Sequence, residues 1–264
     1  MSDKGIVMKK LVEILPDKQA LIERSLTLVL EKMQSAIQER GQCTLALSGG
    51  STPKPLYEAL AEQPLPWEKI QVFWGDERYV PSDHPESNQR MARQAWLDRV
   101  SIPAANIHPM PTSAGDPARD AQNYETELQQ WFKLHSGEVP VFDIVLLGIG
   151  DDGHTASLFP RTEALKVSDR LVTVGNKDGQ PRLTFTARLI NQARCVIFLV
   201  AGESKRPALK QIFAPSGDEM TYPARLVQPK GELWWLLDKA AGAELNSTTS
   251  DQRAIGDQSL KANN

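Results

Sequence analysis

The amino-acid sequence predicts an α/β fold with a single, open, mostly parallel sheet flanked by helices. Short apolar segments bounded by turn residues alternate with longer stretches of helical periodicity, the pattern of strands that cross over through helices. No internal repeat and no Gly/Ser-rich or Pro-rich linker divides the chain, so a single domain accounts for it. We place this domain at residues 10–245, between an N-terminal extension at 1–9 and a polar tail at 246–264 that we expect to be disordered.

Each expected element follows from a local pattern. The expected strands are the apolar segments at residues 43–47, 70–74, 142–148, 171–174, 195–200 and 233–237. The first expected helix, at residues 21–37, places Ile22, Val29 and Met33 on one face and ends before Gly41, a residue that commonly terminates helices. Further helices are expected at residues 53–62, 87–97, 117–134, 205–213 and 239–245, and several begin after Ser, Thr or Asp, which cap free N–H groups.

The composition is that of a folded, water-soluble protein. Of 264 residues, 41% are hydrophobic and 24% are charged, near the averages for globular domains. The formal net charge is −3, with no block of like charge, which argues against nucleic acid or an anionic membrane as a partner. No apolar run approaches the ~18 residues of a membrane span, and the first residues lack a signal peptide's apolar centre. Because Cys43 and Cys195 both lie in apolar, β-branched segments, we expect buried, reduced thiols and a cytoplasmic protein.

A glycine turn at residues 48–53 (SGGSTP) follows the expected strand at 43–47. Gly49 and Gly50 allow a ligand to approach the backbone, while Ser48, Thr52 and the free N–H groups of the next helix can hold a phosphate. The turn lacks the Walker and dinucleotide spacings, so a nucleotide is not expected. On this segment alone, an ordinary turn whose hydroxyls only cap the helix is an equally good interpretation.

A histidine loop at residues 148–154 (GIGDDGH) follows the expected strand at 142–148 and leads into an expected short helix. His154 is a candidate for proton transfer near neutral pH, and Asp152 can orient it. A histidine that only caps a helix is the alternative, but the neighbouring carboxylates and glycines favour chemistry. No serine elbow and no zinc-type cluster is present. Water activated by His154 is therefore the simplest nucleophile, and we expect no metal and no cofactor.

Three cationic side chains are candidate phosphate partners. Arg78 follows the expected strand at 70–74, and its planar guanidinium matches phosphate oxygens. Lys205 begins an expected helix, where a cation opposes the helix dipole unless an anion lies nearby. Arg182 is the third candidate. Taken singly, each has a structural alternative: a salt-bridged surface turn for Arg78, a solvated lysine for Lys205 and a strand-edge arginine for Arg182.

The order and spacing of these segments resemble the 6-phosphogluconolactonase family, part of a larger group that includes the glucosamine-6-phosphate deaminases. The matching stretches are residues 47–53 (LSGGSTP), 74–81 (WGDERYVP), 87–88 (SN), 148–160 (GIGDDGHTASLFP) and 202–205 (GESK). The Gly-x-Asp-Gly-His core is shared with the deaminases, whereas residues 155–160 (TASLFP) resemble the lactonases and lack the glutamate typical of deaminases there. The resemblance extends over residues 10–245.

The resemblance implies a Rossmann-like sheet without a dinucleotide site. It implies hydrolysis of 6-phospho-D-glucono-1,5-lactone to 6-phospho-D-gluconate, the second step of the oxidative pentose phosphate pathway. His154 would be the general base that activates water and then the acid that protonates the leaving ring oxygen, with Asp152 assisting it. The implied phosphate and substrate site consists of Ser48, Gly49, Gly50, Thr52, Arg78 and Lys205, with Arg182 as a less certain member.

The expected partner is therefore a small sugar-phosphate lactone, bound by a monomer or a weak homo-oligomer. Two other functions remain open at this point. One is an isomerase or deaminase acting on an amino-sugar phosphate, for which Asp76 is the spare carboxylate. The other is a catalytically silent sugar-phosphate sensor, although no DNA-binding module precedes the domain and His154 would then be superfluous.

Overall fold

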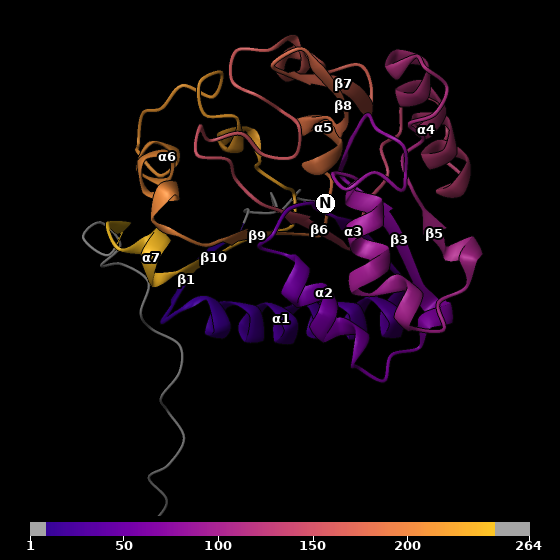
Figure 1. Ribbon diagram of the computed structural model, residues 1–264, viewed down its shortest axis with the longest axis horizontal. Coiled ribbons are helices and arrows are strands. Elements are labelled where there is room, and N and C mark those ends of the chain that lie inside the picture. The colour runs from indigo at the N-terminus through magenta and orange to yellow at the C-terminus, as the bar shows by residue number, and fades with distance from the viewer. Residues whose placement is uncertain (1–8, 246–264) are drawn as a thin grey trace, which may run out of the picture.

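The computed structural model describes residues 9–245, and a seven-stranded sheet runs through it (Figure 1). The strands lie in the order β1-β10-β9-β6-β2-β3-β5, and all neighbouring pairs are parallel. Their bounds are β1 Lys9–Leu15, β2 Cys43–Leu47, β3 Ile70–Trp74, β5 Ile107–His108, β6 Ile144–Leu147, β9 Cys195–Val200 and β10 Glu232–Asp238. The predicted α/β fold with a mostly parallel sheet is confirmed.

Helices cover both sides of this sheet. They are α1 Lys18–Arg40, α2 Lys54–Ala61, α3 Asn88–Ala95, α4 Pro117–Trp131, α5 Ala187–Ile190, α6 Arg206–Ile212 and α7 Lys239–Gly242. In Figure 1, α1 runs along the lower side, and α4 and α5 lie on the upper side. The side chain of Asp17 caps α1 by accepting the N–H of Ala20, and Gly41 ends the helix with a φ of 80°. None of the helices within residues 9–245 is long and apolar enough to cross a membrane.

A second, three-stranded antiparallel sheet lies above the first. It consists of β4 Asp76–Arg78, β8 Gln180–Phe185 and β7 Val172–Lys177, in the order β4-β8-β7. The segment at 171–174, which we expected among the strands of the parallel sheet, lies in this hairpin instead. The expectation was wrong because an apolar run looks the same in either sheet, and only its pairing partner distinguishes them.

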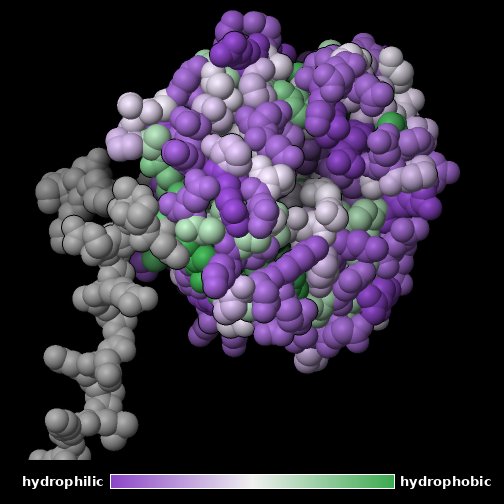
Figure 2. All heavy atoms as spheres, turned by 60° about the vertical axis from the view of Figure 1, so that its left-hand side comes forward, coloured by the Kyte–Doolittle hydropathy of each residue, from purple (hydrophilic) through white to green (hydrophobic). Residues whose placement is uncertain are grey.

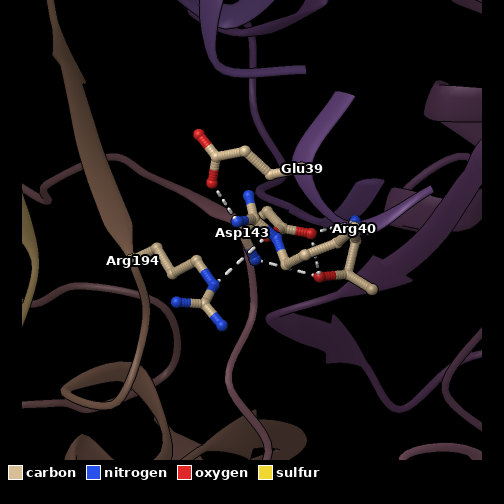
Figure 3. Close-up of polar contacts among 5 residues, drawn as sticks. Glu39, Arg40, Asp143 and Arg194 are labelled. Carbon is tan, nitrogen blue, oxygen red and sulfur yellow. Dashed lines mark hydrogen bonds and ion pairs between the residues drawn. The ribbon is translucent and has the colours of Figure 1, made fainter. Parts of the chain in front are cut away.

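A buried carboxylate joins the amino ends of three neighbouring strands (Figure 3). Asp143, just before β6, accepts hydrogen bonds from the backbone N–H of Thr44 in β2 at 2.8 Å and from Arg40 Nε at 2.9 Å. The Nε of Arg194, just before β9, lies 3.4 Å from Oδ1 of the same carboxylate. Because parallel strands all start at this edge, the Asp143 cluster links β2, β6 and β9 at the end of the sheet opposite the carboxyl ends of the strands.

The interior holds one large hydrophobic core, which includes both thiols: Cys43 and Cys195 are free and buried, as expected. On the outside, the face in Figure 2 is mainly hydrophilic, with hydrophobic residues in small, separate patches. The predicted division into an extension, a domain and a tail stays a prediction. Residues 1–8 and the proposed tail at 246–264 lie outside the described residues.

Candidate active site

The strand order creates a switch point between β2 and β6. From β2 the chain proceeds to β3 and β5 on one side, then returns to place β6 against the other side of β2. At such a point the loops after the two central strands diverge and leave a crevice, where α/β proteins bind ligands. Here the loop after β2 is the glycine turn, and the loop after β6 is the histidine loop.

A cavity of about 300 Å³ occupies this crevice. That volume is at the lower end of the range for small-molecule sites. Its lining includes eight residues that the sequence singled out: Ser48, Gly49, Gly50, Thr52, Arg78, His154, Arg182 and Lys205. Asp152, the ninth, is not among the lining residues but contacts His154. The fold therefore brings together all the predicted site residues from five separate segments of the chain.

Asp152 holds the ring of His154 in the histidine loop. His154 Nδ1 lies 2.6 Å from Asp152 Oδ1, which also accepts the His154 backbone N–H at 3.1 Å. Burial acts to raise the pKa of the Asp152 carboxyl, but the hydrogen bonds from His154 outweigh it and lower the pKa to about 2. Asp152 is therefore ionised at neutral pH, and its contact with Nδ1 leaves Nε2 as the nitrogen available to a ligand or water.

The ring of His154 lies so close to the backbone of residue 150 that this residue must be glycine. A Cβ on Gly150 would lie 2.1 Å from His154 Nδ1 and 2.6 Å from Asp152 Oδ1. The Gly150 N–H also donates to the His154 carbonyl at 2.9 Å, which closes the loop. On its other side the ring contacts Phe159, with centroids 4.6 Å apart. These contacts fix the orientation of the imidazole before any ligand arrives.

The segment after His154 is not the short helix that we expected. Thr155 and Leu158 form an isolated bridge, and the next helical residues are the 3₁₀ turn Glu163–Lys166. The Thr155 hydroxyl donates to the Gly148 carbonyl at 2.9 Å, and the Ser157 hydroxyl donates to Asp76 at 2.7 Å. Because these side chains bond to neighbouring loops, the backbone follows tertiary contacts instead of helical ones. The interpretation of His154 as a helix cap is therefore wrong.

Arg78 and Arg182 form one cationic wall of the cavity. They are direct partners in the antiparallel pair of β4 and β8. Burial, together with the charge of Arg78, lowers the pKa of the Arg182 guanidinium. Arg78 Nη1 donates to the Glu86 carbonyl at 2.6 Å, and Arg182 lies over the Phe159 ring, 5.4 Å from its centroid. Neither contact neutralises the charge, although the carboxylates of Asp76, Glu77 and Glu86 act on Arg182 in the opposite direction to Arg78.

Lys205 lines the cavity from the loop after β9. Its Nζ lies 2.6 Å from Asp151 Oδ1, and the Lys205 side chain is 21% exposed. The hydroxyl of Ser204 donates to the same oxygen at 3.0 Å. The hydrogen bond from Lys205 is the main cause that lowers the pKa of Asp151. Lys205 is thus an oriented, mostly buried cation and not a solvated surface lysine. Its partner Asp151 was not among the predicted site residues.

Further lining residues were not among the predicted ligands. Asp76 and Asn88 lie between the glycine turn and the histidine loop, and both are buried. Lys177, at the end of β7, also lines the cavity. The sequence indicates Asp76 as a spare carboxylate after a central strand and Asn88 as a helix cap or a partner for a sugar hydroxyl, whereas Lys177 belongs to a hairpin with no local motif. No group of three or more His, Cys, Asp or Glu side chains within residues 9–245 is placed to hold a metal ion.

Comparison with known proteins gives a consistent result. Residues 16–235 match the family model described as glucosamine-6-phosphate isomerases/6-phosphogluconolactonase. The chain is 68% identical over 234 residues to a 6-phosphogluconolactonase from Synechocystis sp., covering 89% of this chain and 98% of the relative. A relative of the same name from Nostoc sp. is 66% identical over 239 residues, covering 90% of this chain and all of the relative.

Solved structures agree with the sequence comparisons. The 6-phosphogluconolactonase from Trypanosoma brucei superposes with a TM-score of 0.81 at 33% identity, over 90% of this chain and 100% of that one. The 6-phosphogluconolactonase from Thermotoga maritima superposes with a TM-score of 0.77 at 33% identity, over 88% and 100%. The resemblance expected from the motifs is thereby confirmed: the chain belongs to the glucosamine-6-phosphate isomerase/6-phosphogluconolactonase family.

Proposed function

We propose that this protein hydrolyses 6-phospho-D-glucono-1,5-lactone to 6-phospho-D-gluconate by means of water activated by His154. The observation that supports this most directly is the His154–Asp152 pair, which lies 2.6 Å apart at a cavity also lined by a glycine turn and by the cations Arg78 and Lys205. The names of the relatives agree with this substrate.

In the proposed reaction, His154 Nε2 removes a proton from water as the water oxygen attacks the lactone carbonyl carbon. The tetrahedral intermediate then collapses: the bond from the carbonyl carbon to the ring oxygen breaks, and the imidazolium returns its proton to that oxygen. Asp152 stays ionised throughout because its pKa lies near 2, so it stabilises the transient imidazolium and holds the ring orientation. The net change is the addition of one water molecule, which yields a carboxylic acid and a free hydroxyl.

The phosphate of the substrate is proposed to lie at the glycine turn, among Ser48, Gly49, Gly50 and Thr52. The turn leads directly into α2, and its last residue, Pro53, precedes the helix and also lines the cavity. Arg78, Arg182 and Lys205 supply the compensating charge. With the phosphate held there, the other end of the sugar reaches across the cavity toward His154.

The deaminase alternative fits this site less well. Ring opening and proton transfer between carbons need a second positioned acid–base group. Residues 155–160 contain no carboxylate, and one oxygen of Asp76, the spare carboxylate, already accepts the hydroxyl of Ser157 at 2.7 Å.

The deciding experiment follows the loss of freshly made 6-phosphogluconolactone with and without the protein, because this lactone also hydrolyses spontaneously. We expect strong acceleration, much weaker acceleration with unphosphorylated gluconolactone, and no ammonia from glucosamine 6-phosphate. Ammonia release without any effect on the lactone would reverse the proposal and make Asp76 the first residue to substitute.

A further inference from the structure

Asn88, the first residue of α3, is buried between two of the loops that form the cavity. Its side chain is 2% exposed, and its Nδ2 donates to the backbone carbonyl of Asp76 at 2.9 Å. Its Oδ1 is buried without a hydrogen-bond partner and lies against Gly49. A Cβ on Gly49 would lie 1.9 Å from that oxygen, so the glycine turn and the Asn88 amide share one closely fitted contact.

The buried Glu77 anchors the backbone of Asn88. Its buried carboxylate accepts the backbone N–H groups of Asn88 at 2.8 Å and Gln89 at 2.7 Å, as well as the hydroxyl of Ser87 at 3.1 Å. Together these bonds fix the first turn of α3 against β4. Glu77 is 2% exposed, and this burial raises its pKa despite the bonds. The backbone of Asn88 is therefore held by Glu77 and its side-chain Nδ2 by the Asp76 carbonyl, both outside the glycine turn.

The same residues contact the segment that directly follows the histidine loop. The backbone carbonyl of Asp76 accepts from Asn88, and the carboxylate of Asp76 accepts the Ser157 hydroxyl at 2.7 Å. Ser157 is fully buried three residues after His154, and its N–H donates to Thr184 in β8 at 3.1 Å. A continuous set of contacts thus runs from Gly49 through Asn88 and Asp76 to Ser157, three residues after His154.

We propose that Asn88 is a positioning residue that sets the glycine turn relative to the histidine loop, and so sets the distance from the bound phosphate to the reacting carbonyl. The inference rests on the proposed function, because it assigns the phosphate to the glycine turn. Asn88 acts through Gly49 and does not itself need to touch the substrate. A rigid separation matters because a displacement of about 1 Å can reduce turnover roughly a hundredfold.

The first test compares Asn88→Ala with Asn106→Ala. Asn106 is the matched control: its side chain is 9% exposed and its Nδ2 also bonds to backbone carbonyls, including that of Ile70 at 3.0 Å, but it lies before β5 and away from the cavity. Both variants should lose thermal stability. We expect only Asn88→Ala to reduce the preference for phosphorylated over unphosphorylated lactone, by about tenfold to a hundredfold, because the glycine turn can then shift relative to His154. Asn88→Ser serves as the milder variant if the alanine protein does not fold.

The second test enlarges the side chain at position 49, alone and together with a smaller side chain at position 88. Gly49 does not have a left-handed φ, so Gly49→Ala is obstructed by the Asn88 amide and not by its own backbone. We expect Gly49→Ala to lower both stability and phosphate discrimination, and Gly49→Ala/Asn88→Ala to perform no worse than Asn88→Ala alone. Additive losses in the double variant would show that the two residues do not act on each other and would overturn the proposal.

The outcomes also separate this inference from the proposed function. If the unaltered protein hydrolyses both lactones at the same rate, the phosphate assignment fails, and the role of Asn88 fails with it. If the unaltered protein discriminates and Asn88→Ala, or Asn88→Ser in its place, discriminates equally well, only the positioning role is wrong. Loss of discrimination in Asn106→Ala as well would also overturn it, because general destabilisation would then account for the effect.

Discussion

Arg78 of β4 and Arg182 of β8 lie directly opposite each other in an antiparallel pair. Like charges in this arrangement repel each other, and the effect is visible in the lowered pKa of Arg182, to which burial contributes most and Arg78 next. The strands nevertheless hold both guanidinium groups at the edge of the cavity. An anion between or beside them would relieve the repulsion, which is the physical reason to expect the phosphate of the ligand there.

Inorganic phosphate should therefore raise the melting temperature of the protein, because a ligand that binds only the folded state stabilises it. We expect Arg182→Gln to need roughly tenfold to a hundredfold more phosphate for the same rise in melting temperature, since a charge-assisted hydrogen bond contributes about 1.5–3 kcal/mol. A thermal shift titration measures it. The control is Arg188→Gln, which removes a half-buried arginine bonded to backbone carbonyls away from the cavity. Equal responses in all three proteins would contradict the assignment.

His154→Ala should fold and bind phosphate but lose on the order of 10²–10⁴ in kcat, the usual contribution of general acid–base catalysis. The measurement is the enzyme-dependent rate of lactone hydrolysis after subtraction of the spontaneous rate. His84→Ala is the matched control, because His84 is 42% exposed in a loop outside the cavity lining. A folded His154→Ala protein with an unaltered rate would remove His154 from the mechanism.

The pH dependence of stability should identify the Asp152–His154 contact. The folded-state pKa of Asp152, about 2, lies below the ordinary value of ~3.9, so its contribution to stability is complete above about pH 4 and is lost as the pH falls toward 2. Between pH 4 and pH 2, the melting temperature of Asp152→Asn should therefore fall less than that of the unaltered protein. The effect should be modest, because the Asp152 side chain is 47% exposed. Parallel pH curves for the two proteins would count against the assigned contact.

The same substitution should lower kcat at neutral pH by on the order of 10² or more, since removal of the orienting aspartate in serine hydrolase triads costs about 10⁴. Asp178→Asn provides the control, an exposed aspartate in the turn between β7 and β8. Kinetics at saturating lactone separate this effect from substrate binding. A kcat equal to that of the control would leave Asp152 with a structural role only.

Hydrolysis should persist after exhaustive chelation, because the proposed reaction takes its proton acceptor from His154 and its anion-binding charge from arginine and lysine. The measurement is the initial rate before and after dialysis against a chelator, with the melting temperature recorded on the same samples. Loss of rate without loss of folding, followed by recovery on addition of one divalent ion, would show that a metal takes part.

Local patterns in the sequence were sufficient for most elements next to the cavity. The bounds of β2, β3 and β9 were predicted to the residue, because each is an apolar run closed by turn residues. The sequence did not reveal β1, β4, β5 or β8. β4 and β5 have three and two residues, too few for a periodic signal. β1 and β8 mix charged and apolar residues, and each is defined by its pairing, with β10 in one case and with β4 and β7 in the other.

By itself, the sequence determined the chemistry that each strand end presents: glycines and hydroxyls after β2, and a histidine with two carboxylates after β6. These are local properties, since a turn and its side chains lie within a few consecutive residues. Only the tertiary structure decided that β6 lies beside β2, that Arg78 faces Arg182, that Asp151 holds Lys205 and that Asn88 packs on Gly49. Such contacts join residues far apart in the chain. They depend on strand order and on the fit of whole elements in the core, which no single segment specifies.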